Sequence, residues 1–208
     1  MPLVFLFFIL ISSVYPCTIG IGFDNQGSLF LFKNRDKRIE CIDSTSVPVR
    51  TNTLYLDDNF TSNDFLSITT SETKNVYFGT NSSNLAIANA YVYVNEDSLI
   101  ENNYRDFRIS SNATLIKRTL MLCDNLICFE TILDDSLENL FANDTISSNF
   151  AVFDNDNNAA IYEVYADTNV AIWDKFELDF DTNKFIFRTN HFLSDSLQSY
   201  NPDESDNT

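Results

Sequence analysis

The residues with the clearest chemical potential begin at Cys17, which directly follows the apolar stretch Met1–Pro16. Removal of that stretch would leave the Cys17 thiol and a free α-amino group on the same residue. An α-amino group has a pKa of about 8, so it can take the thiol proton as a general base. The chain has one histidine, His191, so a thiol–imidazole pair would depend on that residue alone. The sequence therefore predicts an N-terminal cysteine nucleophile that carries its own base, and we assign His191 a structural role.

The leader fits a secretory signal better than a membrane span. Met1–Pro16 contains no charged side chain, and Leu3–Ile11 is uniformly apolar. A bilayer span needs about 20 apolar residues, whereas this run suits the apolar region of a signal peptide. Cysteine would be exposed by a cut after Ser13 and loss of a short pro-segment, or by attack of the Cys17 thiol on the Pro16–Cys17 bond. We expect a secreted protein or one of the secretory or lysosomal lumen; the alternative is a buried first strand.

Composition limits the classes of partner. The 208 residues carry a net charge of −17, from 13 Lys and Arg against 30 Asp and Glu, and 44% of them are hydrophobic. So acidic a chain disfavours nucleic acid and anionic membrane surfaces as partners, because both attract basic side chains. One histidine and four glycines supply neither a zinc-ligand spacing nor a glycine-rich phosphate loop. We expect one globular domain that needs no metal and no cofactor.

The cysteines and the glycan acceptor sequences leave several outcomes open. If Cys17 stays free, three cysteines remain, so at most one disulfide forms within the chain and one cysteine is left over. Cys123 and Cys128 lie in an apolar stretch of helical character, where cysteine is most often a small core residue. Four Asn-x-Ser/Thr sequences match the acceptor pattern for N-glycosylation, at Asn59, Asn81, Asn112 and Asn143.

Hydrophobic periodicity predicts strands, then two helices, then strands again. A second helix, beginning near Asn125, carries an apolar stripe at spacings of three and four, and Asp124 or Asn125 can cap its start. Clustered strands around a helical pair favour an α+β layered fold over a doubly wound parallel sheet. The first helix is expected over Asn112–Cys123, and the strands over Thr18–Phe23, Ser28–Phe32, Thr53–Leu56, Leu66–Thr70, Val76–Gly79, Leu85–Val94, Phe150–Phe153, Ala159–Ala166, Val170–Trp173, Phe176–Phe180 and Lys184–Arg188.

Four ordered motifs resemble one group of enzymes. They are Cys17-Thr18 with an Asp-x-x-Gly turn and Lys-Asn-Arg-Asp ending at Asp36; Gly-Thr-Asn81 followed by Leu-Ala-Ile-Ala-Asn; the turn and Ile-Tyr-Glu of residues 154–163; and Arg-Thr-Asn190-His-Phe. This order resembles the choloylglycine hydrolase, penicillin V acylase and isopenicillin-N acyltransferase group of N-terminal-nucleophile (Ntn) hydrolases. The resemblance implies a four-layer αββα sandwich with antiparallel sheets and a helical pair.

The resemblance also implies roles for individual residues. Cys17 would be nucleophile and base, and Asp36 would hold its α-amino group. Asn190, with Asn81, would donate side-chain N–H groups to the tetrahedral oxyanion. Lys33 and Arg35 would lie beside the substrate, Lys33 where the bile-salt and penicillin enzymes usually carry Arg. A surface ion pair for Arg35 and Asp36, and a turn role for Asn190, are the alternatives. A glycan on Asn81 and a catalytic Asn81 exclude each other.

The sequence thus predicts a leader over residues 1–16, an Ntn-hydrolase-like domain over 17–193, and a disordered acidic tail over 194–208. The predicted activity is cleavage of a linear amide bond through a thioester acyl-enzyme, with hydrolysis and acyl transfer both open. The predicted partner is a small N-acyl compound, and the mature chain is expected to have no membrane span; a homo-oligomer is also compatible. Since no Arg follows Arg188 where the group carries one, the alternative is an inactive secreted binding protein on the same fold.

Overall fold

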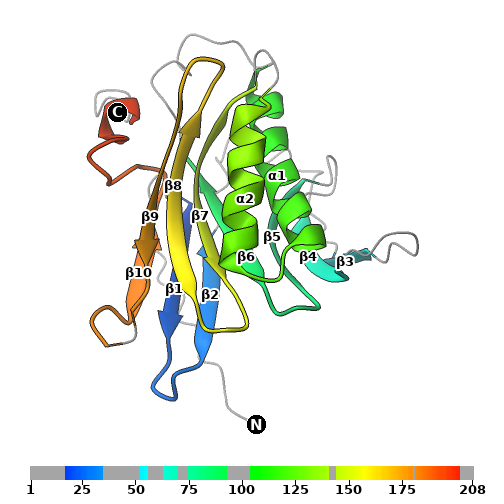
Figure 1. The fold of residues 1–208 in the computed structure, drawn as a ribbon, viewed down its shortest axis with the longest axis vertical. Helices are drawn as coiled ribbons and strands as arrows, with labels where there is room; N and C mark the ends of the chain where they lie inside the picture. Colours follow the sequence, from blue (N-terminus) through cyan, green and yellow to red (C-terminus); the bar gives the residue numbers. More distant parts are fainter. Residues whose placement is uncertain are drawn as a thin grey trace, which may run out of the picture.

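A computed structural model of the chain describes residues 17–34, 52–55, 63–69, 75–92, 104–140, 144–179 and 181–201. The strands form two antiparallel sheets, and two helices pack on the larger one (Figure 1). The smaller sheet has the order β10 (Phe185–Arg188), β1 (Thr18–Phe23) and β2 (Leu29–Asn34). The larger sheet runs in sequence order through β3 (Asn52–Tyr55), β4 (Phe65–Thr69), β5 (Val76–Asn81), β6 (Ala86–Tyr91), β7 (Ile146–Phe153), β8 (Ala159–Ala166) and β9 (Ala171–Glu177).

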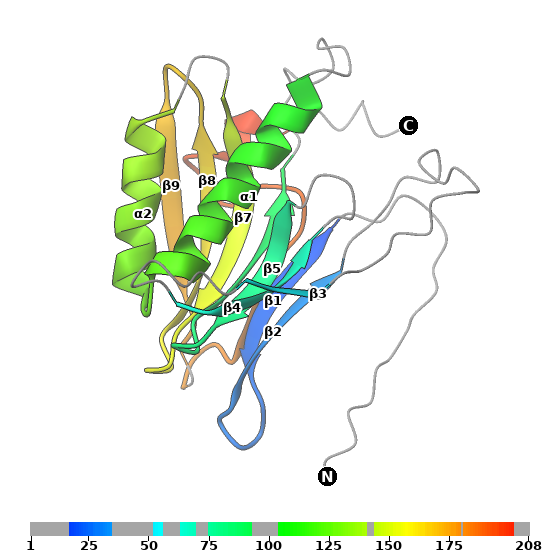
Figure 2. The same ribbon diagram turned by 90° about the vertical axis from the view of Figure 1, so that its right-hand side faces the viewer.

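The helices α1 (Tyr104–Leu122) and α2 (Leu126–Glu138) cover one face of the larger sheet, as Figure 2 shows from the side. The predicted stripe of α2 is confirmed, because Phe129, Ile132, Leu133 and Leu137 are buried in the helix–sheet core. The Asn125 side chain caps α2 by accepting a hydrogen bond from the Cys128 amide at 2.9 Å. Helix α1 begins at Tyr104, eight residues before the predicted Asn112. The prediction omitted its first two turns because they carry few apolar residues at helical spacing.

The two sheets face each other across a second core. In β1 the alternating sequence Ile19-Gly20-Ile21-Gly22 sends both isoleucines into this core. Small alanines on the opposing strands, such as Ala88, let the sheets approach closely. The glycines face the other way, beneath phenylalanine rings: a Cβ on Gly20 would lie 2.3 Å from the Phe32 ring. Phe32 and Phe185 stack there with ring centroids 5.7 Å apart.

The α+β class with antiparallel sheets and a helical pair is therefore confirmed. Within the described ranges no helix covers the outer, phenylalanine-bearing face of the small sheet, so these ranges supply three of the four expected layers. The predicted strands Val170–Trp173 and Phe176–Phe180 are one strand, β9, and β7 begins four residues before the predicted Phe150. No described helix is long and apolar enough to cross a membrane.

The domain continues past the predicted boundary at residue 193. Leu197 is fully buried, and Tyr200 stacks on Tyr165 with ring centroids 4.1 Å apart. Asn201 exchanges two hydrogen bonds with the backbone of Phe192, at 2.7 and 2.8 Å. Residues 194–201 thus pack on the sheet and do not form a disordered tail. The segment was predicted to be disordered because it is mostly polar, yet Leu197 and Tyr200 pack against the domain. The rest of the predicted tail lies outside the described residues.

Candidate active site between the two sheets

Cys17 stands immediately before β1, the central strand of the small sheet, and is half-buried with a free thiol. Side chains alternate along a strand, so Cys17 shares the inward face of Ile19 and packs against the core between the sheets. On that face Ile19 is flanked by its register partners, Lys33 on β2 and Arg188 on β10. The head of β1 therefore places a thiol, an ammonium and a guanidinium along one inward face.

The β1–β10 register also brings Asn190 toward Cys17. The β1–β10 ladder ends at the Ile19–Arg188 pair, next to Cys17 on one strand and Asn190 on the other. An antiparallel continuation by two residues would set Asn190 opposite Cys17. Asn190 is 6% exposed, and its Nδ2 donates a hydrogen bond to the carbonyl oxygen of Tyr91, at the end of β6. An amide nitrogen carries two hydrogens, so a second N–H remains for another acceptor. This is the property that an oxyanion donor requires.

The backbone around Asn190 is held by Asn149 of β7. Asn149 is fully buried, and its Nδ2 donates to the carbonyl oxygens of Thr189 and His191 at 2.7 and 3.0 Å. His191 thus contributes its backbone here. The Oδ1 atoms of Asn149 and Asn190 are buried and accept no hydrogen bond from the described residues. Buried amide oxygens without a donor are uncommon, and a water molecule or a ligand can supply the missing hydrogen. Asn112 Oδ1, on α1, is unpaired in the same way.

Lys33 turns toward the end of β6. Its Nζ donates to the backbone carbonyl of Asn89 and lies 3.4 Å from Asn89 Oδ1 and 5.8 Å from the centroid of the Tyr77 ring. Asn89 Nδ2 in turn donates to the Ser148 hydroxyl at 3.1 Å. The ammonium is therefore fixed by the large sheet at the same end as Asn190.

The structure does not bring Asn81 to this end. Asn81 closes the β5–β6 turn, and its Oδ1 accepts from the amides of Ser83 and Leu85 at 3.1 and 3.0 Å. Tyr91, which binds Asn190, lies six residues along β6 from Leu85, about 20 Å at 3.3 Å per residue. The Asn81 side chain therefore lies at the opposite end of the strand from Asn190.

Both donors of Asn81 are also occupied. Its Nδ2 donates to the carbonyl oxygens of Leu120 and Cys123, at 3.0 and 2.6 Å, and so binds the end of α1. The second glycan acceptor in the described ranges, Asn112, is 2% exposed. A glycosidic bond needs a free and exposed amide nitrogen, so neither side chain can carry a glycan in the folded protein. Asn59 and Asn143 lie outside the described residues, as do Arg35, Asp36, Cys41 and the leader.

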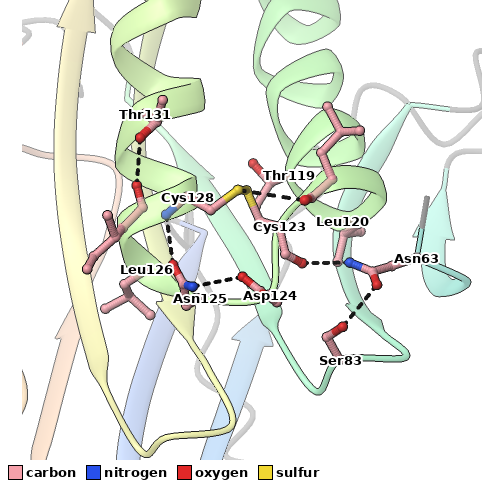
Figure 3. The surroundings of a disulfide bond; sticks show 12 residues. Asn63, Ser83, Thr119, Leu120, Cys123, Asp124, Asn125, Leu126, Cys128 and Thr131 are labelled. Carbon is pink, nitrogen blue, oxygen red and sulfur yellow. Dashed lines mark hydrogen bonds between the residues drawn. A yellow bond between two sulfur atoms is a disulfide. The ribbon is translucent and has the colours of Figure 1, made fainter. Parts of the chain in front are cut away.

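Cys123 and Cys128 form a disulfide across the turn between α1 and α2, which is the one disulfide that the cysteine count allowed (Figure 3). Cys123 is also fully buried in the helix–sheet core, with Cys128 packed against it. The Cys123 carbonyl also accepts a 2.8 Å hydrogen bond from Asn63, whose Oδ1 accepts one from the Ser83 hydroxyl at 2.9 Å. The helix turn is thereby tied to the β5–β6 turn. Among the described cysteines, Cys17 alone keeps a free thiol.

Of the residues that the sequence predicted for the site, the structure places Cys17, Lys33 and Asn190 at one end of the space between the sheets. Sequence reasoning missed Asn149 because the predicted strand began one residue later, at Phe150. A polar residue within an otherwise apolar strand pattern was the available signal. The described residues contain no group of three or more His, Cys, Asp or Glu side chains arranged for a metal ion.

A hollow in the described surface lies elsewhere. It has a volume of about 610 Å³ and includes Phe23, at the opposite end of β1 from Cys17. Its remaining lining comes from the turns at the lower end of Figure 1, with Gly27 and Asn157, and from the end of β9 and the residues after it, with Glu177, Leu178 and Asp179. The candidate site therefore rests on the residues between the sheets and not on this hollow.

No family model and no curated protein sequence matches the chain. Among solved structures, the chain is similar to the Caenorhabditis elegans ortholog of N-acylethanolamine-hydrolyzing acid amidase, with a TM-score of 0.54. The sequences are 14% identical over 84% of this chain and 70% of that one. The chain has an Ntn-hydrolase-like fold. At this identity the likeness concerns the fold. In this chain Cys17 lies immediately before β1, the central strand of the small sheet.

Proposed function

We propose that the protein is an amidase that uses Cys17 as an N-terminal nucleophile on linear N-acyl compounds. The observation that carries the proposal is that Cys17, free and inward-facing at the head of β1, lies at the same end of the small sheet as Asn190, which has a spare N–H. The Ntn-hydrolase-like fold and the amide-hydrolysing structural neighbour support it. The disulfide supports a secretory or lumenal location, because such bonds persist in oxidising compartments.

The reaction begins once the leader is removed and Cys17 bears a free α-amino group. That amine takes the thiol proton while the sulfur attacks the amide carbonyl carbon. The oxyanion of the tetrahedral intermediate accepts a hydrogen bond from the second N–H of the Asn190 side chain. The C–N bond then breaks, and the leaving amine receives the proton from the α-ammonium group. A thioester to Cys17 remains.

Water, or an acceptor amine, then attacks the thioester. The α-amino group takes a proton from the attacking molecule, the C–S bond breaks, and the thiolate recovers the proton. Water gives a carboxylic acid, whereas an amine gives a new amide. Lys33, whose ammonium is held by the Asn89 carbonyl, would supply a fixed positive charge that suits a polar or anionic part of the substrate. Asp36 and Arg35 are assigned by resemblance to the α-amino group and the substrate.

The test is N-terminal sequencing of the mature protein together with hydrolysis of a long-chain N-acyl 4-nitroanilide. We expect Cys17 as the first residue, and a loss of about 1,000-fold or more in Cys17→Ala. The matched control is the double variant Cys123→Ala/Cys128→Ala, which removes the two disulfide-bonded cysteines and retains Cys17. A different first residue, or hydrolysis that survives Cys17→Ala, overturns the mechanism. A matured Cys17 without hydrolysis or acyl transfer favours the inactive binding protein.

A further inference from the structure

A buried carboxylate lies next to the segment that carries Asn190. Glu163 sits in the middle of β8 with its side chain fully buried. It is the register partner of Asn149 on β7, so the two side chains leave the large sheet side by side on the same face. Asn149 already binds the backbone on either side of Asn190. The position of Glu163 suggests that it also holds the segment around Asn190.

The Glu163 carboxylate binds both ends of one short segment. Its Oε1 accepts a hydrogen bond from Nε of Arg188, the last residue of β10. Its Oε2 accepts from the backbone amides of Leu193 and Ser194, at 2.7 and 2.9 Å. Residues 189–192, with Asn190 among them, lie between these two attachments. The chain therefore leaves β10 and returns to one and the same carboxylate.

Arg188 is itself fixed. Its guanidinium lies 4.3 Å from the centroid of the Phe176 ring, and its Nη1 donates to the carbonyl of Phe187 at 2.9 Å. The side chain is 9% exposed, so the Arg188–Glu163 pair is a desolvated ion pair. Such a pair contributes little net stability compared with apolar residues of equal size, but it imposes one defined geometry. Because Arg188 lies two residues before Asn190, the fixed ion pair also restricts the position of Asn190.

We propose that Glu163 is a positioning residue of the active site, which sets Asn190 against Cys17 by holding both ends of residues 188–194. The inference rests on the proposed function, since the position of Asn190 matters when its N–H meets an oxyanion. Glu163 fixes the ends of the segment and Asn149 fixes its middle. The Asn190 amide is thereby held so that one N–H binds Tyr91 and the other remains for the oxyanion.

A matched control exists on the other face of the sheet. Glu130 of α2 also pairs with a cation, Lys175 of β9, at 2.9 Å, and accepts a 2.8 Å hydrogen bond from the Tyr162 hydroxyl. Burial raises the pKa of Tyr162 well above its ordinary value, so this hydroxyl remains a donor. Glu130→Gln therefore removes a carboxylate from an ion pair without touching residues 188–194.

The first measurement is hydrogen exchange at the backbone amides of Leu193 and Ser194 in the mature protein. In Glu163→Gln we expect both amides to exchange at least about tenfold faster, while Glu130→Gln leaves them unchanged. This measurement needs no substrate. Unchanged exchange in Glu163→Gln overturns the inference, whatever the outcome for catalysis. If exchange is faster in Glu163→Gln but the wild-type protein hydrolyses no amide, Glu163 still fixes residues 188–194, whereas the proposed function is wrong.

The second measurement is hydrolysis of the same N-acyl 4-nitroanilide. We expect Glu163→Gln to lower kcat about 100-fold with KM within about twofold, because a small displacement of a catalytic donor has that effect. In an Asn190→Ala background the same change should have little further effect, since Glu163 acts through Asn190. Fully multiplicative losses in the double variant would show that Glu163 does not act through Asn190.

Glu163→Gln leaves Arg188 buried without its carboxylate, which can prevent folding. The charge-balanced variant Glu163→Gln/Arg188→Gln removes both charges and keeps similar volumes. It should fold, retain the disulfide of the helix turn, and show the same fall in kcat and the same faster exchange. Wild-type kcat in this variant contradicts the inference, because the two attachments of residues 188–194 are then shown to be dispensable.

Discussion

The two ends of strand β6 use the same type of side chain in opposite ways. At the β5–β6 turn, Asn81 donates both N–H groups and accepts two amide hydrogens, so its hydrogen-bonding capacity is fully used within the protein. At the other end, Asn190 gives one N–H to Tyr91, and its buried Oδ1 accepts nothing from the described residues. A satisfied amide builds the structure, whereas an unsatisfied buried amide is costly to keep and suits a site completed by a ligand.

Of the substitutions that test this comparison, Asn190→Ala is expected to have the largest effect, on the rate of amide hydrolysis. Asn190→Ala removes the proposed oxyanion donor and one hydrogen bond, to Tyr91. We expect kcat on an N-acyl 4-nitroanilide to fall about 100- to 1,000-fold, with little change in KM. Stability should change by about 1 kcal/mol, because a single net hydrogen bond is lost. Steady-state kinetics and urea unfolding of the mature protein measure the two effects; unchanged kcat would exclude Asn190 as the donor.

Asn81→Ala should show the reverse pattern. It leaves the carbonyls of Leu120 and Cys123 and the amides of Ser83 and Leu85 without their partner at a buried position. We expect a loss of about 2–4 kcal/mol in the free energy of unfolding, since buried groups left unpaired cost about 1–3 kcal/mol each and some regain water. Activity per folded molecule should stay at the wild-type level. A fall in kcat comparable to that of Asn190→Ala would return Asn81 to the active site.

The sequence could identify the local features that differ between these regions but not their spatial relation. The β1–β2 and β7–β8 hairpins were predictable because Asp24 and Asp154 each begin a turn whose amides bind the aspartate side chain. The stripe and cap of α2 were likewise encoded within a few residues. Each of these features depends on neighbours in the chain.

The candidate site depends on contacts between distant residues. Asn149 reaches Thr189 and His191 across about forty residues of sequence, and Asn190 reaches Tyr91 across ninety-nine. A motif match weighs Asn81 and Asn190 equally, because it contains nothing about which hydrogen-bond donors are already used. The partners of the one possible disulfide stayed open for a related reason: cysteines in an apolar helical stretch resemble core residues unless the helix is known to break between them.

The smallest effect is expected at that break, where the disulfide supports the Asn81 end. Cys123→Ala/Cys128→Ala removes a crosslink between residues five apart, and the loop-entropy relation gives a cost of about 2 kcal/mol for so short a loop. The Cys123 carbonyl can still accept from Asn63 and Asn81, since those bonds involve the backbone. Unfolding by urea should therefore show a smaller loss than Asn81→Ala, and Cys17 should keep full activity because its end of the molecule is unchanged. A loss of hydrolysis at intact stability would mean that the two ends of β6 are coupled, and the separation between structural and catalytic amides would no longer hold.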